Sequence, residues 1–134
     1  MKPIAEGVFT WPSDDPHLLG SRCGECGTYD FPAQGSCRRC GAEGAATVEL
    51  SATGTLWTWT TQGFLPKHPY AGPETEADFA PYLVGYVELP DQLRVETRLV
   101  GVAATDVRIG MPMRLAIVPF RDDTLMYAFE PAPA

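Results

Sequence analysis

All the cysteines of the chain fall into two short repeats of the form C-x2-C-G, a spacing that suits metal binding: Cys23, Cys26, Cys37 and Cys40. In a zinc knuckle the chain folds tightly around the metal and backbone amides point at the thiolates, a turn that the glycines Gly27 and Gly41 permit. Two knuckles supply four ligands and close a tetrahedral site. Because no position is left for water or substrate, the pattern predicts a structural metal.

Two other uses of four cysteines compete with zinc. A pair of disulfides would need an oxidising compartment, and it would be unexpected in a chain with its own core. Iron also accepts four sulfur ligands, as in a rubredoxin-type centre. An electron carrier usually needs a redox partner or a second cofactor, and the sequence indicates neither. We therefore expect structural zinc, with a rubredoxin-like electron carrier as an open alternative.

The rest of the chain offers little for catalysis. Catalysis would need a nucleophile beside a base, or a paired acid and base. It would also need hydrogen-bond donors that stabilise the negative charge of the transition state. The histidines His17 and His68 have no nucleophile beside them in sequence. There is no G-x-S-x-G elbow, phosphate-binding glycine loop or His-rich metal motif. We expect no catalytic residue, so the chain is not an enzyme by itself.

From Ala45 onward the pattern changes to short strand-like segments separated by Gly and Pro. They are rich in β-branched and aromatic residues, and several alternate with a period of two. With no convincing long helix, they predict an all-β fold and a small closed barrel. The six segments are ATVELS (46–51), GTLWTWTTQ (54–62), PYLVGYVEL (81–89), QLRVETRLV (92–100), MRLAIVPF (113–120) and TLMYAFE (124–130).

The connections agree with a barrel. Pro90-Asp91 and the segment 121–123 are suited to tight hairpin turns. We expect aromatic and aliphatic side chains of two of the predicted strands to stack on neighbouring strands and to pack in the core: Leu56, Trp57, Trp59, Val84 and Tyr86. Residues 63–80 form a long segment with three prolines and no periodicity. Because its four large apolar side chains do not suit a purely solvated segment, we expect a loop that packs on a partner or a ligand: Phe64, Leu65, Tyr70 and Phe79.

Size and charge limit the possible functions. With 134 residues, 45% of them hydrophobic, the chain suits one folding unit with a small appended module. A formal charge of -7 would repel a phosphate backbone, so we expect no nucleic-acid partner. Prolines and acidic residues at the amino terminus do not resemble an export signal, and no apolar stretch is long enough to cross a membrane. We expect a cytoplasmic protein.

The ordered set of these motifs resembles a known family. A four-cysteine ribbon followed by SATGTLWTWTT, APYLVGYVEL and LVGVAATDVRIGMPMRL is similar to the OB-fold, acyl-CoA-associated zinc-ribbon proteins. The likeness covers roughly residues 18–130, with Phe31-Pro32 as the aromatic-proline step of the ribbon. It implies an N-terminal extension over 1–17, a rubredoxin-like zinc ribbon over 18–44 and an OB-fold domain over 45–134.

The resemblance also implies a function. Members are non-catalytic partners of thiolase-like enzymes, including thiolases, sterol-carrier-like aldolases and hydroxymethylglutaryl-CoA synthases, and they help to bind the CoA part of the substrate. We therefore expect a hetero-oligomer with a thiolase-like subunit that shares a CoA ester and acts in lipid, steroid or aromatic degradation. The cationic residues that could contact CoA are Arg22, Arg38, Arg39, Lys67 and His68.

Two departures from the family pattern limit this inference. Many members begin with an amphipathic helix, which Pro12 and Pro16 disfavour here. Many also follow the ribbon's Phe-Pro with a proline and a basic residue, whereas this chain has Ala33 and Gln34. The alternative function is a nucleic-acid-binding module, because zinc ribbons and OB barrels both serve that role and Trp57 and Trp59 could stack on bases.

Overall fold

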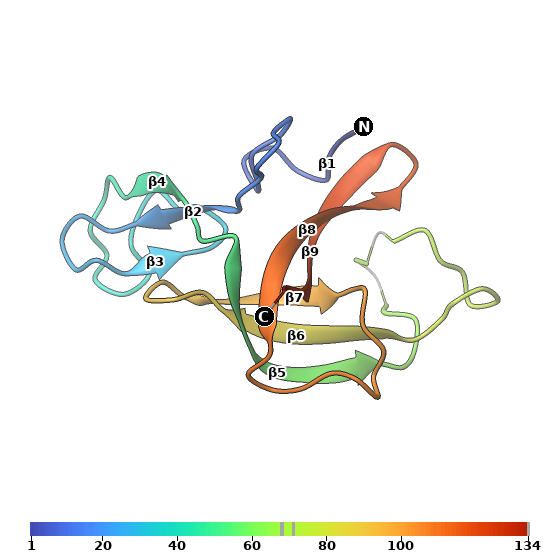
Figure 1. Cartoon of the computed structure of the whole chain (residues 1–134). Helices are drawn as coiled ribbons and strands as arrows, with labels where there is room; N and C mark the ends of the chain where they lie inside the picture. The colour runs from blue at the N-terminus through green and yellow to red at the C-terminus, as the bar shows by residue number, and fades with distance from the viewer. Residues whose placement is uncertain (68, 71, 134) are drawn as a thin grey trace.

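The computed structural model describes residues 1–67, 69–70 and 72–133, and strands are its regular elements (Figure 1). The described residues contain no helix long and apolar enough to cross a membrane. The strands are β1 (Lys2–Pro3), β2 (Leu19–Arg22), β3 (Tyr29–Asp30), β4 (Ala46–Glu49), β5 (Thr53–Gln62), β6 (Tyr82–Glu88), β7 (Arg94–Leu99), β8 (Pro112–Arg121) and β9 (Thr124–Pro131). The all-β prediction is confirmed.

Five of these strands close into a barrel. β5, β6 and β7 form an antiparallel meander, and β8 pairs with β9 over most of their length. The first residues of β5 pair with β8, and Leu99 of β7 pairs with Phe129 of the parallel β9. Every barrel strand therefore has two neighbours, and the closed barrel that the sequence predicts is confirmed.

The predicted strand at 46–51 exists as β4, but its expected place in the barrel is wrong. β4 pairs antiparallel with β2, and β2 also pairs with β3, so the three strands form a separate small sheet around the cysteines. The chain enters the ribbon along β2 and leaves it along β4, which satisfies the backbone groups of both strands. The barrel begins only after Leu50, whose amide donates to the Leu18 carbonyl.

Both predicted hairpin turns are confirmed. β6 and β7 are joined through Asp91, which has a φ of 58°, and β8 and β9 through Asp122, which has a φ of 47°. Aspartate accepts this left-handed conformation more readily than most residues do. The second hairpin carries the ends of β8 and β9 beyond the rest of the barrel (Figure 1).

One hydrophobic core fills the barrel and extends to the start of the ribbon. Leu56, Val87 and Phe129 are fully buried inside it, and Trp59 packs against it. The expected core positions of Trp57 and Tyr86 are wrong, because these side chains are 46% and 39% exposed. The pairing of β5 with β6 has an irregularity between Leu56 and Thr58, so the outward side chains do not follow a simple alternation there.

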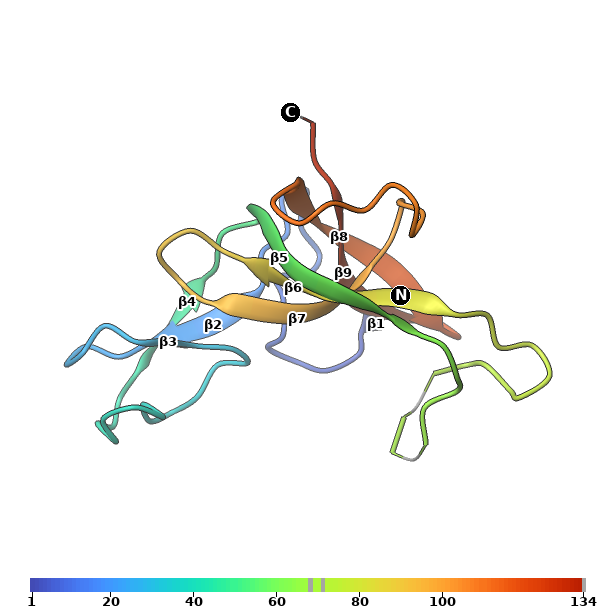
Figure 2. The same cartoon turned by 90° about the horizontal axis from the view of Figure 1, so that it is seen from below.

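The ribbon and the long loop lie at opposite ends of the barrel. In Figures 1 and 2 the sheet of β2, β3 and β4 lies at the left and the loop between β5 and β6 at the right. The amino-terminal segment forms no helix in the structure. It adds β1 parallel to β9 and places Phe9 opposite Leu18, so that Phe9 joins the core.

Candidate metal centre

The two cysteine knuckles have the same backbone geometry. In the first, the Gly27 amide donates to the Cys23 carbonyl, and Gly27 has a φ of 75°. In the second, the Gly41 amide donates to the Cys37 carbonyl, and Gly41 has a φ of 76°. This left-handed conformation costs glycine little, which explains why each pair is followed by this residue.

Backbone amides in each knuckle also point at a thiol. The amides of Glu25 and Cys26 lie 3.4 and 3.5 Å from the Cys23 Sγ atom. In the same way, the amides of Arg39 and Cys40 lie 3.3 and 3.5 Å from the Cys37 Sγ atom. N–H groups at these positions stabilise a thiolate more than a neutral thiol.

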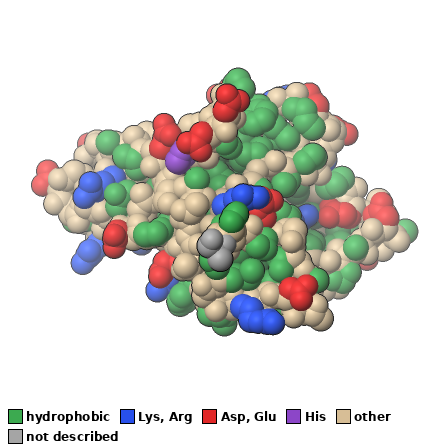
Figure 3. All heavy atoms as spheres, in the orientation of Figure 1, with side chains coloured by type: hydrophobic (Ala, Val, Ile, Leu, Met, Phe, Trp, Pro, Cys, Tyr) green, Lys and Arg blue, Asp and Glu red, His purple; other side chains and the backbone are tan. Residues whose placement is uncertain are grey.

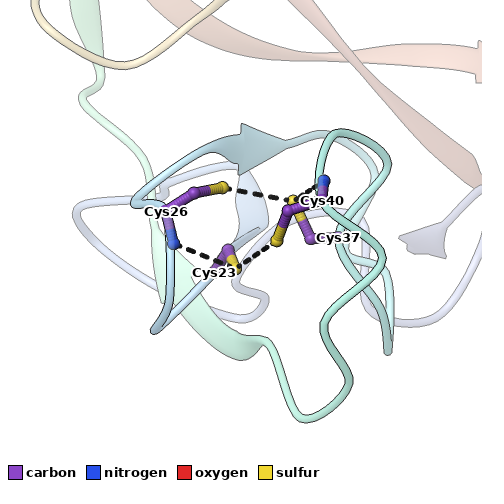
Figure 4. Close-up of side chains that lie close together, drawn as sticks. All are labelled: Cys23, Cys26, Cys37 and Cys40. Carbon is purple, nitrogen blue, oxygen red and sulfur yellow. Dashed lines mark hydrogen bonds between the residues drawn. The ribbon is translucent and has the colours of Figure 1, made fainter.

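The knuckles bring all four sulfur atoms together between them (Figure 4). The four Sγ atoms lie within 4.8 Å of one another. Two pairs, Cys23 with Cys40 and Cys26 with Cys37, join the two knuckles and have Sγ atoms 3.6 Å apart. Cys23 and Cys37 are buried, whereas Cys26 and Cys40 reach the surface. The cluster is therefore open to ion entry on one side.

The thiols influence one another's protonation. The Thr28 hydroxyl, 3.1 Å from the Cys26 Sγ atom, is the main cause that lowers the pKa of Cys26 to about 6. The backbone amides of Cys40 and Arg39 lower the pKa of Cys37. The Ala42 amide favours the Cys40 thiolate, but the Cys23 thiol and burial outweigh it and raise the pKa of Cys40 to about 12. Not all four thiols can ionise without a compensating cation.

The donor set fits a tetrahedral soft or borderline metal ion. Four sulfur donors from two C-x2-C pairs match structural zinc sites, and a divalent ion would remove the repulsion between the thiolates. The same donors would also accept iron. All four ligand positions are protein thiols, so the centre as built can hold a metal but has no open coordination position for a substrate.

Polar contacts around the buried Asp30 hold the ribbon together. Its carboxylate forms an ion pair with Arg38 and accepts a hydrogen bond from the Arg38 amide, which ties β3 to the second knuckle. The guanidinium of Arg22 lies over the Tyr29 ring, 5.4 Å from its centre. The Ser21 hydroxyl accepts from the Gln34 amide. The cysteine spacing did not predict these contacts of Asp30 and Ser21, although both residues lie in the segment predicted to form the ribbon.

The residues predicted to contact CoA do not form one site. Arg22, Arg38 and Arg39 are exposed and belong to the ribbon. Lys67 is exposed on the long loop at the other end of the barrel (Figure 1), and His68 lies outside the described residues. Two of the ribbon arginines already make contacts inside the ribbon. Arg39 is therefore the ribbon cation whose side chain is best placed for an external anion.

The other predicted histidine has a structural setting. The His17 Nδ1 atom lies 2.7 Å from the Leu50 carbonyl oxygen, at the junction of ribbon and barrel, and Nε2 lies 3.3 Å from Asp15. The Leu50 carbonyl is the main cause that raises the pKa of His17. Both ring nitrogens therefore lie next to oxygen atoms of the protein, and the ring helps to join the two parts of the fold.

Sequence reasoning missed a groove on the outer face of β6 and β7. Arg94, Glu96 and Arg98 alternate along β7 and all point outward, which the RVETR pattern could have indicated. Arg94 stacks on Trp57 at 3.9 Å and Arg98 on Tyr82 at 3.6 Å from the ring centres. Tyr82 lies on the adjacent strand β6, and Trp57 lies on β5, on the far side of β6 from β7, so both contacts depend on the strand register.

Comparison with known proteins gives two matching family models. The model described as ChsH2, rubredoxin-like zinc ribbon domain, matches residues 11–44. The model described as ChsH2, C-terminal OB-fold domain, matches residues 47–118. The matches follow the order of ribbon and barrel in the structure. Four clustered cysteines and a closed five-stranded barrel are the features that these descriptions lead one to expect.

Individual relatives match most of this chain in sequence. The chain is 34% identical over 108 residues to the benzoylsuccinyl-CoA thiolase subunit BbsA of Thauera aromatica, covering 81% of this chain and 68% of BbsA. It is 33% identical to a probable enoyl-CoA hydratase alpha subunit of Thermomonospora curvata, over 86% of this chain but only 34% of that protein. The chain thus spans about a third of the length of that relative.

A solved structure titled Ltp2-ChsH2(DUF35) aldolase contains a similar fold. It superposes with a TM-score of 0.66 and 32% sequence identity, covering 86% of this chain and 84% of the matched chain. The likeness includes both the ribbon and the barrel, because neither part alone amounts to that share of the chain.

Proposed function

Because the chain belongs to the DUF35 family of ChsH2-type zinc-ribbon and OB-fold proteins, we propose that it is a non-catalytic accessory subunit of a thiolase-superfamily enzyme acting on an acyl-CoA. The relatives support this proposal. BbsA is a subunit of a thiolase, and the related solved structure is that of the Ltp2-ChsH2(DUF35) aldolase. The hydratase subunit is about three times longer than the matched region, so its activity is not transferred.

In this proposal the metal is zinc and its role is to hold the ribbon. Cys23, Cys26, Cys37 and Cys40 would be its ligands, and the ion would supply the positive charge that lets four adjacent thiols lose their protons. The convergence of the sulfur atoms and the amides that point at Cys23 and Cys37 support this assignment. The reacting groups of the enzyme would lie on the partner chain.

The CoA ester would be shared with the partner, and Arg39 would contribute a cation to it. Arg39 is exposed beside the metal centre, and its backbone already contacts Cys37, so the knuckle fixes the base of its side chain. A guanidinium suits phosphate oxygens because it donates in a planar, two-pronged arrangement. Lys67 lies at the other end of the barrel, so a contact with the same CoA would require the molecule to extend along the barrel.

Reconstitution tests this proposal. The thiolase-like partner would be assayed for acyl-CoA turnover alone, with the wild-type chain and with Arg39→Gln. We expect turnover to need both chains, and Arg39→Gln to raise the KM for the ester by about tenfold, as expected for one charge-assisted hydrogen bond of about 1.5 kcal/mol. Arg108→Gln, which removes an exposed charge on the barrel, is the matched control. An unchanged KM would remove Arg39 from the site.

The same assay also tests the accessory role. If the partner alone turned over the ester at the full rate with unchanged KM, the chain would not be part of the active assembly. Turnover by this chain without a partner would contradict its non-catalytic role. Lys67→Gln, assayed in the same way, tests the loop contact separately from Arg39.

A further inference from the structure

A hollow of about 540 Å³ lies on the outer face of β6 and β7, between the long loop and the β8–β9 hairpin. This volume falls within the range of small-molecule sites. In OB folds the outer face of the second and third barrel strands, with the loops beside it, is the usual place for ligands. Those strands are β6 and β7 here, and the two loops are the segment at 63–80 and the turn at Asp122. The hollow therefore lies where this fold commonly binds other molecules.

The walls of the hollow are mainly apolar and aromatic. Tyr82 and Val84 of β6 form the floor, and Phe120 and Tyr127 come from the hairpin. Tyr70 of the loop meets Phe120 edge to face, with ring centres 6.2 Å apart. Hydrophobic side chains also gather over the hairpin in Figure 3. Rings on several sides offer surfaces on which a flat apolar molecule can pack.

One end of the hollow has a fixed group of hydrogen-bond donors. The Arg98 Cζ atom lies over the Tyr82 ring, 3.6 Å from its centre, and the guanidinium donates to the Tyr70 hydroxyl at 3.1 Å. Tyr70 in turn donates to Glu74 at 2.8 Å. The stacked ring and the hydroxyl hold the guanidinium in place, so further N–H groups of its planar fork have set directions.

The charges around the hollow argue against an ionic ligand. The Glu74 carboxylate lies 4.0 Å from the Arg98 guanidinium, and Glu96 also borders the hollow. At this hollow two carboxylates against one guanidinium disfavour an anion, and the guanidinium disfavours a cation beside it. The second guanidinium nearby, that of Arg94, is paired with Glu88 at 2.9 Å. An uncharged molecule with an oxygen acceptor satisfies the donors and avoids both repulsions.

A second hollow of about 380 Å³ continues from the first towards the ribbon. The two share Ile4, Glu96, Met126 and Tyr127, so they form one groove along β7. The far part reaches Phe31, whose ring packs against Tyr127 with centres 5.5 Å apart. The groove therefore extends along β7 over two joined hollows and suits an extended ring system.

We propose that the groove on β6 and β7 binds an uncharged, flat apolar molecule whose oxygen accepts a hydrogen bond from Arg98. The ligand would pack on Tyr82 and Val84 and under the β8–β9 hairpin. This site is separate from the ribbon arginine proposed to contact CoA. It belongs to the chain alone and does not rest on the accessory role, so either proposal can fail without the other.

Dye binding to the isolated full chain tests this proposal. Nile red is an uncharged planar dye with a carbonyl oxygen, and its fluorescence rises in an apolar site. We expect saturable binding to one site. Val84→Trp and Val118→Trp each fill part of the groove and should weaken binding by about tenfold or more. Thr55→Trp adds the same indole at an exposed position outside the groove and should leave binding unchanged. Thermal melting would verify that each variant is folded.

Arg98 gives a second, more specific readout. Arg98→Lys keeps the charge but loses the planar fork, so we expect binding weaker by roughly threefold to tenfold, the effect of one hydrogen bond of about 1 kcal/mol. The assignment is overturned if wild-type protein does not bind the dye, or if folded Val84→Trp and Val118→Trp both bind it as wild type does. Displacement of the dye by single-stranded DNA at low salt would also overturn it, in favour of a nucleic-acid groove.

Discussion

The ribbon and the barrel are stabilised by different means. From the start of β2 to the end of β4 the buried residues are small, polar or cysteine: Gly20, Ser21, Cys23, Asp30 and Cys37. The barrel instead buries large apolar side chains such as Leu56, Val87 and Phe129. The ribbon has too little apolar material for a core of its own. Its fold therefore depends on the metal centre and on polar contacts, whereas the barrel depends on burial of apolar surface.

Among the substitutions that test this difference, we expect the largest effect from Cys37→Ser. Removal of one buried ligand should abolish tight metal binding and unfold the ribbon, because structural zinc sites supply on the order of 10 kcal/mol to the fold of such modules. We expect about one zinc per wild-type chain and none in the variant by elemental analysis. NMR spectra should lose dispersion for ribbon residues while barrel signals persist. Loss of the barrel signals as well would show that the two parts do not differ in this way.

Phe129→Ala is the converse test. Phe129 is fully buried in the barrel, and truncation of such a ring costs about 3–5 kcal/mol. We expect a large loss in the free energy of unfolding, measured with denaturant in the presence of zinc, while the folded fraction keeps its full metal content. Parallel loss of metal from the folded protein would contradict the separate origins of stability.

A smaller effect is expected from His17, which joins the two parts. Its folded-state pKa is raised above the ordinary 6.5, chiefly by the Leu50 carbonyl. A raised folded pKa means that the protonated form stabilises the protein below pH 6.5, and that this contribution is lost as pH rises through the folded pKa. The melting temperature of the wild type relative to His17→Gln should therefore fall as pH is raised from 6 to 8.

This comparison also controls for the metal. Protonation of thiols weakens metal binding at low pH in both proteins, so the difference between their melting temperatures isolates the histidine. A difference that is constant across the range would show that His17 does not contribute through its charge.

Local patterns in the sequence predicted the parts that depend on neighbouring residues. The cysteine spacing with Gly27 and Gly41 predicted two knuckles. Segments rich in β-branched and aromatic residues, several of them alternating, predicted the barrel strands, and the turn residues between them predicted both hairpins. The pairing of β4 with β2 could not be predicted, because β4 has the composition of any short strand and its partner lies far away in sequence. In a regular strand Trp57 and Trp59 would share one face, and the irregular register with β6 lets Trp59 pack against the core while Trp57 is exposed; this register is also a long-range property.

The same reason limits what the sequence says about sites. The four thiols were predicted because each knuckle is local, and the symmetric spacing brings the knuckles together. The groove combines Tyr82, Arg98 and Tyr70 from two strands and a loop, and no short motif marks such a set. The shared CoA site would also include a second chain, so its residues cannot be complete in this sequence alone.

Native mass spectrometry of the protein, isolated from its host under mild conditions through a carboxyl-terminal tag, tests the central claim most directly. The account predicts a hetero-oligomer in which each copy of this chain carries one zinc ion and is present in fixed ratio with a thiolase-like chain. The chain alone, a complex with nucleic acid, or an iron-loaded chain paired with a redox protein would contradict it.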